Sequence, residues 1–161
     1  MAISVGDKIP DVKVQTPTAD GPQAVQTADV LGHGKVVLFG VPGAFTPTCS
    51  DYHLPGFVLR ADDLHAKGVT TIACTSVNDA FVMAAWGEAR EVGAKVVLLA
   101  DGSADFARAL GLDIDLSGGG LGVRSKRFSA IIDDGVVTDL TVEDDGLGLD
   151  KSGAEGVLAK L

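Results

Sequence analysis

Short apolar runs, separated by glycine, proline and charged residues, form the main pattern along this chain. Runs rich in branched aliphatic residues predict buried strands. We expect such strands over Lys35–Val41, Thr70–Thr75, Ala94–Ala100, Phe128–Ile132 and Val136–Val142. Asp134-Gly135 between the last two runs predicts a tight hairpin. Val12-Lys13-Val14 and a segment near Ala24-Val25 predict two shorter strands towards the N-terminus.

Helical patterns alternate with these strands. The predicted helices cover Thr27–Leu31, a segment from Pro47 to Lys67-Gly68, a segment from Asn78 or Asp79 to Val92, Asp105–Leu110 and Ser152–Lys160. Pro55 lies inside the second helix and should kink or break it, because proline removes one backbone hydrogen bond. Alternating strands and helices predict one α/β domain over residues 1–161, with a mixed sheet and helices on both faces.

A glycine-rich segment, Ser117–Gly122, lies between the predicted helix Asp105–Leu110 and the predicted strand Phe128–Ile132. Its spacing does not match a dinucleotide-binding loop, because Val123 stands where the motif needs a glycine. No lysine-threonine pair of a phosphate-binding loop follows it either. The segment therefore predicts a flexible loop and no nucleotide cofactor.

The stretch Val41–Ser50, with the sequence VPGAFTPTCS, joins a predicted strand to a predicted helix. Pro47 suits the first helical position, which makes Thr46 the N-cap, with a side-chain oxygen able to accept an early backbone N–H. Cys49 then occupies the third helical position. Free N–H groups and the positive end of the helix dipole favour a thiolate there. The stretch therefore predicts a nucleophilic sulfur.

Length and charge exclude several classes of protein. The 161 residues suit one domain, and the formal net charge of −9 disfavours nucleic acid and anionic membranes as partners. No apolar run is long enough to span a bilayer, and the N-terminus lacks the regions of a signal peptide. We expect a reducing compartment, the cytoplasm, although a targeting segment removed on maturation would leave no trace in the sequence.

The chain has two cysteines, Cys49 and Cys74. They are too few for a disulfide framework and too far apart for a zinc site, so we expect no metal. Cys74 lies in the middle of the apolar run TTIACT, where burial should keep it protonated and structural. A mid-strand thiol and a thiol at a helix start would also meet the geometry of a disulfide only if the helix unwinds.

The stretch PGAFTPTCS resembles the peroxidatic motif of peroxiredoxins, specifically the type II (peroxiredoxin-5-like) subfamily. The resemblance runs from Val5–Pro10 to the final helix. Other matching blocks are His53–Phe57, Ser76–Asp79, Leu99–Gly102 and Arg127–Ser129. It implies a thioredoxin-like fold and a thiol peroxidase that acts on hydrogen peroxide and alkyl hydroperoxides through a Cys49 sulfenic acid, without metal, haem or flavin.

The resemblance also implies roles for three residues around Cys49. Pro42 would shield the sulfur from water, and the Thr46 hydroxyl would donate to the thiolate or to a peroxide oxygen. Arg127 would hold the thiolate ionised and stabilise charge on the breaking O–O bond. Alternation along the strand does not choose between Arg124 and Arg127; the resemblance does, because the family's arginine directly precedes the aromatic residue that opens this strand.

Partners follow from the same resemblance. Relatives with an internal disulfide carry a resolving cysteine where Lys151 stands, so we expect glutaredoxin with glutathione, or thioredoxin, as the reductant. The helix segment Phe81–Trp86 is apolar on all sides. From the sequence alone, deep burial in the core and a contact with a second chain explain this equally well. The resemblance favours a homodimer through this helix and the Phe45 loop.

The sequence leaves two other classes of function open, a cysteine hydrolase and a binding protein. His53 lies four residues after Cys49 on one helix face, as a cysteine–histidine hydrolase would need, although a structural or surface role for His53 is favoured. His33 and His65 are expected on the surface. A binding protein that forms the sulfenate and passes the oxidation to partners is the second alternative.

Overall fold

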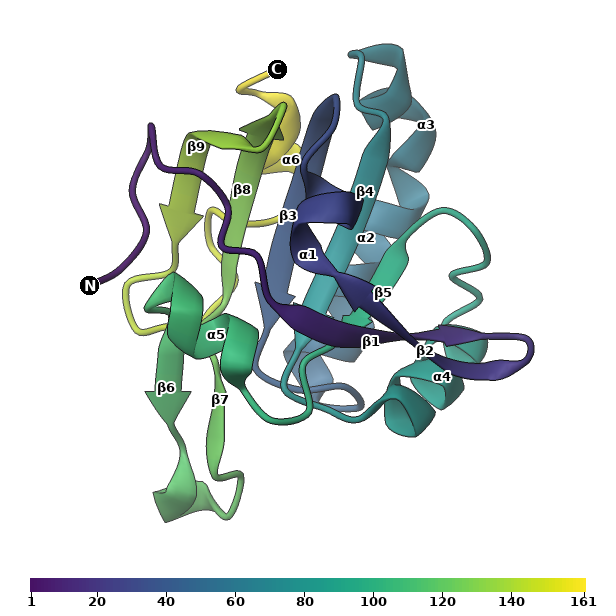
Figure 1. Cartoon of the computed structure of the whole chain (residues 1–161), viewed down its shortest axis with the longest axis vertical. Coiled ribbons are helices and arrows are strands. Elements are labelled where there is room, and N and C mark those ends of the chain that lie inside the picture. Colours follow the sequence, from purple (N-terminus) through teal and green to yellow (C-terminus); the bar gives the residue numbers. More distant parts are fainter.

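A seven-stranded mixed sheet forms the centre of the protein in the computed structural model, which describes residues 1–161 (Figure 1). The strands are β1 (Lys13–Thr18), β2 (Gly21–Gln26), β3 (Lys35–Val41), β4 (Thr71–Ser76), β5 (Val97–Ala100), β8 (Phe128–Asp133) and β9 (Val136–Val142). Their order is β2-β1-β5-β4-β3-β8-β9. The central strands β3, β4 and β5 are parallel and the outer pairings are antiparallel. The predicted mixed α/β, thioredoxin-like architecture is confirmed.

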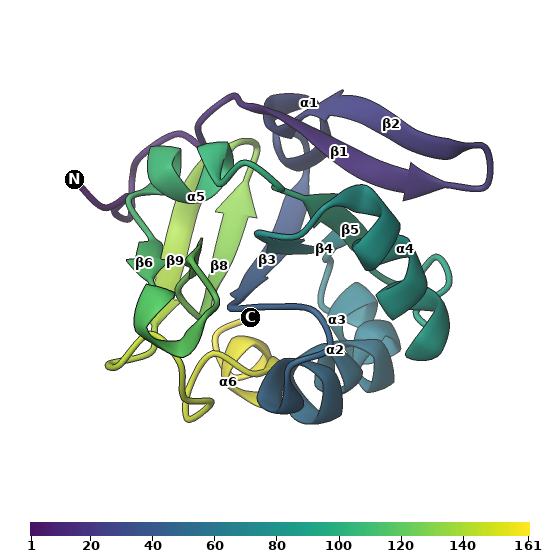
Figure 2. The same cartoon turned by 90° about the horizontal axis from the view of Figure 1, so that it is seen from below.

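Helices cover both faces of this sheet. The helices are α1 (Thr27–Leu31), α2 (Leu54–Leu59), α3 (Ala61–Ala66), α4 (Ala80–Ala89), α5 (Asp105–Leu110) and α6 (Ala154–Leu158). Residues of α2, α3, α4 and α6 pack in one apolar core, and residues of α1 and α5 pack in the other. Figure 2 shows α1 and α5 on one side of the sheet and α2, α3 and α6 on the opposite side. None of the helices combines the length and the apolar character that a membrane span requires.

Strand β3 separates the two cores. Val37, Phe39 and Val41 point into the core of α2, whereas Val36 and Leu38 point into the core of α1. Successive strand residues face opposite sides, so a strand covered on both faces must be apolar throughout. The last residue of the strand, Val41, is therefore buried. The residues that follow it begin at the carboxyl edge of the parallel strands, where open α/β sheets bind their ligands.

The helix after this edge changes type just before Pro55, between His53 and Leu54. A π-helical turn, Cys49–His53, precedes α2, and the Leu54 N–H bonds to the Cys49 carbonyl five residues earlier. Pro55 has no N–H to continue the α-helical ladder, and the wider turn accommodates its ring without breaking the helix. The predicted disturbance is thus a π turn. The helical part predicted after Pro55, through Phe57 to Lys67, is interrupted, because Arg60 leaves the helical conformation between α2 and α3.

Several other predicted boundaries are displaced. Helix α4 ends at Ala89 and not at Val92, and β5 begins at Val97 and not at Ala94. The segment predicted only as a loop is flanked by two strands, β6 (Asp113–Asp115) and β7 (Val123–Ser125), which pair as a separate two-stranded sheet. Strands of three residues carry too little alternation for a sequence pattern to reveal them. Together with a 3₁₀ turn, Ser117–Gly119, they form a flap, residues 113–125.

Candidate active site

Cys49 lies in the first turn of the helix that follows β3. The Ser50 N–H bonds to the Thr46 carbonyl at 3.0 Å, which makes Thr46 the N-cap residue, as predicted. The predicted side-chain cap is wrong: the Thr46 hydroxyl donates to the Gly43 carbonyl at 2.6 Å and so closes the loop before the helix. The Cys49 side chain is fully buried, close to the N-terminal end of this helix.

Arg127 is the residue that reaches the Cys49 sulfur. Its Nη2 donates to Cys49 Sγ at 3.1 Å, and only 2% of the residue is exposed. Strand pairing explains the placement, because Phe128 pairs with Gly40 near the end of β3 and Arg127 stands just before that pair. Arg124 lies in β7 and donates instead to the Leu121 carbonyl at 2.8 Å. Of the two arginines, Arg127 is therefore the one positioned to act on a thiolate.

His53 fixes the other side of the arginine. It is 1% exposed and lies against the rings of Phe39 and Phe57, with ring centroids 4.9 Å and 5.6 Å away. Burial, and then the charge of Arg127, lower the pKa of His53 from 6.5 to about 3, so the ring is neutral at physiological pH. Its Nδ1 accepts from Arg127 Nη1 at 2.9 Å, which assigns the ring hydrogen to Nε2, 3.0 Å from the Ser152 carbonyl.

Both nitrogens of His53 are therefore occupied by groups other than Cys49. A general base must reach the proton that it abstracts, and the His53 ring faces Arg127 and Ser152 instead. The geometry does not favour the cysteine–histidine hydrolase. The expected structural role of His53 agrees with its burial, whereas His33 and His65 are exposed.

The loop that carries Pro42 is held from two sides. Pro42 is buried, and its carbonyl lies 3.4 Å from Arg124 Nη1. The Ala44 N–H donates to Asn78 Oδ1 at 2.9 Å, which ties the loop to the start of α4. The sequence pattern predicts Asn78 as a possible helix cap. Its contact with Ala44 has no local signature, because the two residues meet only when β3 and β4 pair.

A cavity of about 470 Å³ opens beside this cluster. Pro42, Thr46 and Arg127 line its inner end. The outer wall comes from the flap and from the loop after β9, and it includes Leu116, Gly118, Gly119, Leu121 and Leu147. The cavity therefore brings together three of the four predicted site residues, and the fourth, Cys49, is bonded to the arginine that lines it.

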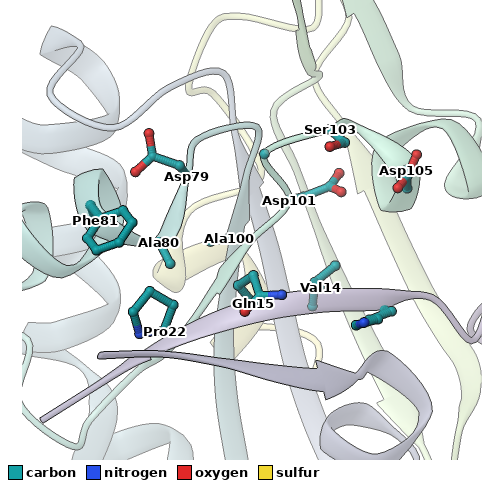
Figure 3. Close-up of a pocket in the computed structure, with 12 residues that line it drawn as sticks. Val14, Gln15, Pro22, Asp79, Ala80, Phe81, Ala100, Asp101, Ser103 and Asp105 are labelled. Carbon is teal, nitrogen blue, oxygen red and sulfur yellow. The ribbon is translucent and has the colours of Figure 1, made fainter. Parts of the chain in front are cut away.

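A second hollow, of about 380 Å³, lies away from Cys49 between β1, β2 and the start of α4 (Figure 3). Its carboxylates have structural partners. Asp79 accepts from the Val82 N–H at 2.8 Å, and Asp101 accepts from the N–H groups of Phe106 and Ala107 at 3.0 and 2.9 Å. These two aspartates hold the starts of α4 and α5, and no cysteine lines the hollow.

Cys74 lies in β4, opposite Phe39 of β3, and is fully buried. Burial, and then the nearby Cys49, raise the pKa of the Cys74 thiol well above its ordinary value. The two cysteines are not bonded to each other. No three histidine, cysteine or acidic side chains are grouped so that they could hold a metal ion.

Comparison with known proteins assigns the family. The family model described as Redoxin matches residues 4–158. The chain is 52% identical over 164 residues to the chloroplastic peroxiredoxin-2E-2 of Oryza sativa subsp. japonica, covering 99% of this chain and 72% of that protein. This chain is a type II peroxiredoxin.

Solved peroxiredoxin structures share its fold closely. Reduced Prx3 of Vibrio vulnificus, in complex with H2O2, superposes with a TM-score of 0.93 at 49% identity and covers 98% of each chain. Peroxiredoxin 5 of Alvinella pompejana superposes with a TM-score of 0.85 at 36% identity, covering 98% of this chain and 96% of that one. This peroxiredoxin is accordingly a thiol-dependent peroxidase, an antioxidant enzyme that reduces peroxides.

Proposed function

We propose that Cys49 is the peroxidatic cysteine and that its thiolate attacks the terminal oxygen of hydrogen peroxide or of an alkyl hydroperoxide. The S–O bond forms as the O–O bond breaks, and the leaving oxygen takes a proton from solvent to become water or an alcohol. The product is the Cys49 sulfenic acid. The observation that carries this proposal is the buried hydrogen bond of 3.1 Å from Arg127 Nη2 to Cys49 Sγ.

The neighbours of Cys49 have separate roles in this proposal. Arg127 brings a fixed positive charge to the thiolate and to the oxygen that becomes negative as the O–O bond breaks. Thr46 shapes the loop through its bond to Gly43 and presents a hydroxyl to the cavity where the peroxide would bind. Pro42, buried at the inner end of that cavity, excludes water from the sulfur.

The cavity supports alkyl hydroperoxides as substrates as well as hydrogen peroxide. Its volume of about 470 Å³ is far larger than a hydrogen peroxide molecule needs. Leu116, Leu121 and Leu147 give it an apolar outer wall, against which an alkyl group can be buried. Binding of an alkyl chain there would leave the peroxide group directed at Thr46 and Arg127.

Glutaredoxin with glutathione, or thioredoxin, would regenerate the enzyme. One thiol of the reductant condenses with the sulfenic acid and releases water, and a second thiol then breaks the mixed disulfide. Lys151 is exposed at the place where relatives with an internal disulfide carry a resolving cysteine, and it pairs with Asp144 at 2.8 Å. Cys74 is buried in β4, so an external thiol is favoured, in a reducing compartment such as the cytoplasm.

A homodimer is the proposed assembly. Phe45 and Phe81 are 53% and 73% exposed, although both are large apolar residues. Phe81 lies at the start of α4 (Figure 3). The hydrogen bond between Ala44 and Asn78 brings the Phe45 loop next to this helix start. The two aromatic rings support one contact surface for a second copy of the chain.

Peroxide consumption by two cysteine variants tests the assignment. Cys49→Ser should abolish turnover of hydrogen peroxide, and Cys74→Ser, matched in chemistry and burial, should keep most of it. Circular dichroism checks that both variants fold. An equal loss of activity in the two folded variants would defeat the proposal.

A second experiment addresses the reductant and the sensing alternative. Turnover is measured side by side with glutaredoxin plus glutathione and with thioredoxin plus its reductase, each in excess. Multiple turnovers with at least one system are expected of an enzyme. A single equivalent of peroxide consumed per chain with both systems would favour a protein that passes the oxidation to a partner.

A further inference from the structure

Glu143 is a buried carboxylate with no part in the chemistry derived so far. It follows β9 directly and is 3% exposed. Its Oε2 accepts four hydrogen bonds: from the N–H groups of Asp150, Lys151 and Ser152 at 3.1, 3.0 and 2.8 Å, and from the Ser152 hydroxyl at 2.6 Å. One carboxylate oxygen thus holds three consecutive residues of the chain across the loop 144–152.

These bonds outweigh the cost of burying a charge. Burial alone would raise the pKa of Glu143, but the donors from Ser152, Lys151 and Asp150 hold that pKa below its ordinary value of 4.5. Glu143 is therefore ionised at neutral pH. A charged acceptor forms stronger hydrogen bonds to N–H groups than a neutral one, so the loop is held firmly at residues 150–152.

The loop that Glu143 closes supplies both carbonyls that orient the active site. Arg127 Nε donates to the Leu147 carbonyl at 2.8 Å, and the Ser152 carbonyl bonds to His53 Nε2 at 3.0 Å. The backbone of Arg127 is tied to the same loop, since its N–H donates to Gly146 and its carbonyl accepts from the Glu143 N–H.

Arg127 is consequently fixed through two of its three guanidinium nitrogens. Its Nε is held by Leu147, its Nη1 by His53, and the remaining group, Nη2, is left for the sulfur of Cys49. Both supports, Leu147 and the Ser152–His53 pair, depend on the loop that Glu143 closes. A planar guanidinium held at two corners has little freedom at the third.

We propose that Glu143 is a positioning residue for the peroxidase reaction, acting through Ser152, His53 and the loop 144–152 to aim Arg127 at Cys49. The proposal rests on the proposed role of Arg127 at the Cys49 sulfur. Glu143 itself does not touch the sulfur or the cavity. Its effect on the reaction passes entirely through the orientation of the guanidinium.

The test is a double-variant cycle with hydrogen peroxide as the probe. The rate constant for Cys49 sulfenate formation is measured by competition with a haem peroxidase. Glu143→Gln keeps the size of the side chain but removes its charge. It should slow the reaction by about 10- to 100-fold, the loss expected when a reacting group is misplaced by about 1 Å. In the Arg127→Gln background, Glu143→Gln should alter the rate by less than about twofold, because the guanidinium that Glu143 orients is absent.

Asp101→Asn is the matched control. Asp101 is also a buried carboxylate that accepts from backbone N–H groups, but it caps α5 away from Cys49. A loss of stability without an effect on the rate is expected there. If Glu143→Gln does not fold, Ser152→Ala takes its place in the cycle. This variant removes the shortest of the four hydrogen bonds to Glu143, and it should slow the reaction by about two- to fivefold.

The outcomes separate this proposal from the function on which it rests. A normal rate in Arg127→Gln would refute the role of the arginine, and the role of Glu143 with it. A slow Arg127→Gln together with a normal rate in Glu143→Gln, or in Ser152→Ala where that variant is used, would overturn only the proposal for Glu143. An equal slowing in the Arg127→Gln background and in the unmodified protein would show that Glu143 acts by another route, and would also overturn it.

Discussion

Buried, neutral His53 should make the stability of this peroxiredoxin fall steeply in mild acid. Burial and the charge of Arg127 lower its pKa from 6.5 to about 3, while the Ser152 carbonyl and the charge of Glu143 oppose the shift. Below pH 6.5 the unfolded chain binds a proton at this histidine and the folded protein does not. Acid therefore stabilises the unfolded state, and stability is lost as the pH falls from 6.5 towards 3.

The size of this loss follows from the same two values. Each pH unit between the unfolded pKa of 6.5 and the folded pKa of about 3 costs about 1.4 kcal/mol, so the loss at pH 5 is about 2 kcal/mol. At pH 3 it reaches about 5 kcal/mol, a large part of the stability of an ordinary domain. Glu143 adds its own loss only below 4.5, because its folded pKa is also lowered.

Urea unfolding of the unmodified protein and of His53→Gln measures the effect. Glutamine can still accept from Arg127 but does not titrate. The difference in unfolding free energy between the two proteins should change by about 2 kcal/mol between about pH 8 and pH 5, at one fixed protein concentration. A variant less stable at every pH by a constant amount would refute the reasoning, because the two curves would then be parallel.

Three further predictions concern other residues. One equivalent of peroxide should leave one added oxygen on the intact chain in mass spectrometry; a loss of two hydrogens, with a Cys49–Cys74 peptide in a non-reducing digest, would make Cys74 a resolving residue. Thr46→Val removes the bond to Gly43 that shapes the loop before Cys49, and it should slow sulfenate formation by about 100-fold; a slowing of less than about fivefold would remove Thr46 from the reaction. Phe81→Asp should weaken self-association in sedimentation, whereas Leu59→Asp, at a residue 81% exposed, should not; a monomer at high concentration in the unmodified protein would exclude the dimer.

Local rules of the sequence account for most of the elements. Helices α1 and α5 and strands β3 and β9 have the predicted bounds. Helices α1 and α5 are each followed directly by a glycine, β3 is a continuous apolar run, and β9 follows the tight turn at Asp134-Gly135. The position of Cys49 in the first helical turn was also readable, because Pro47 and Thr46 determine the helix start within a few residues.

Tertiary structure alone decided how the side chains meet. Arg124 and Arg127 belong to one charged run and are indistinguishable by period, and only the pairing of β8 with β3 turns Arg127 towards Cys49. Glu143 begins an acidic run that has the pattern of a solvated loop, yet it is buried among backbone donors that follow it by seven to nine residues.

The physical reason is the range of the interactions involved. The periodicity and capping signals that predict strands and helices lie within a few neighbouring residues, so the sequence records them. The contacts that orient Arg127 join it to His53, 74 residues away, and to Leu147, 20 residues away. Such bonds form only between surfaces that the sheet has already brought together, and no pattern along the chain records them.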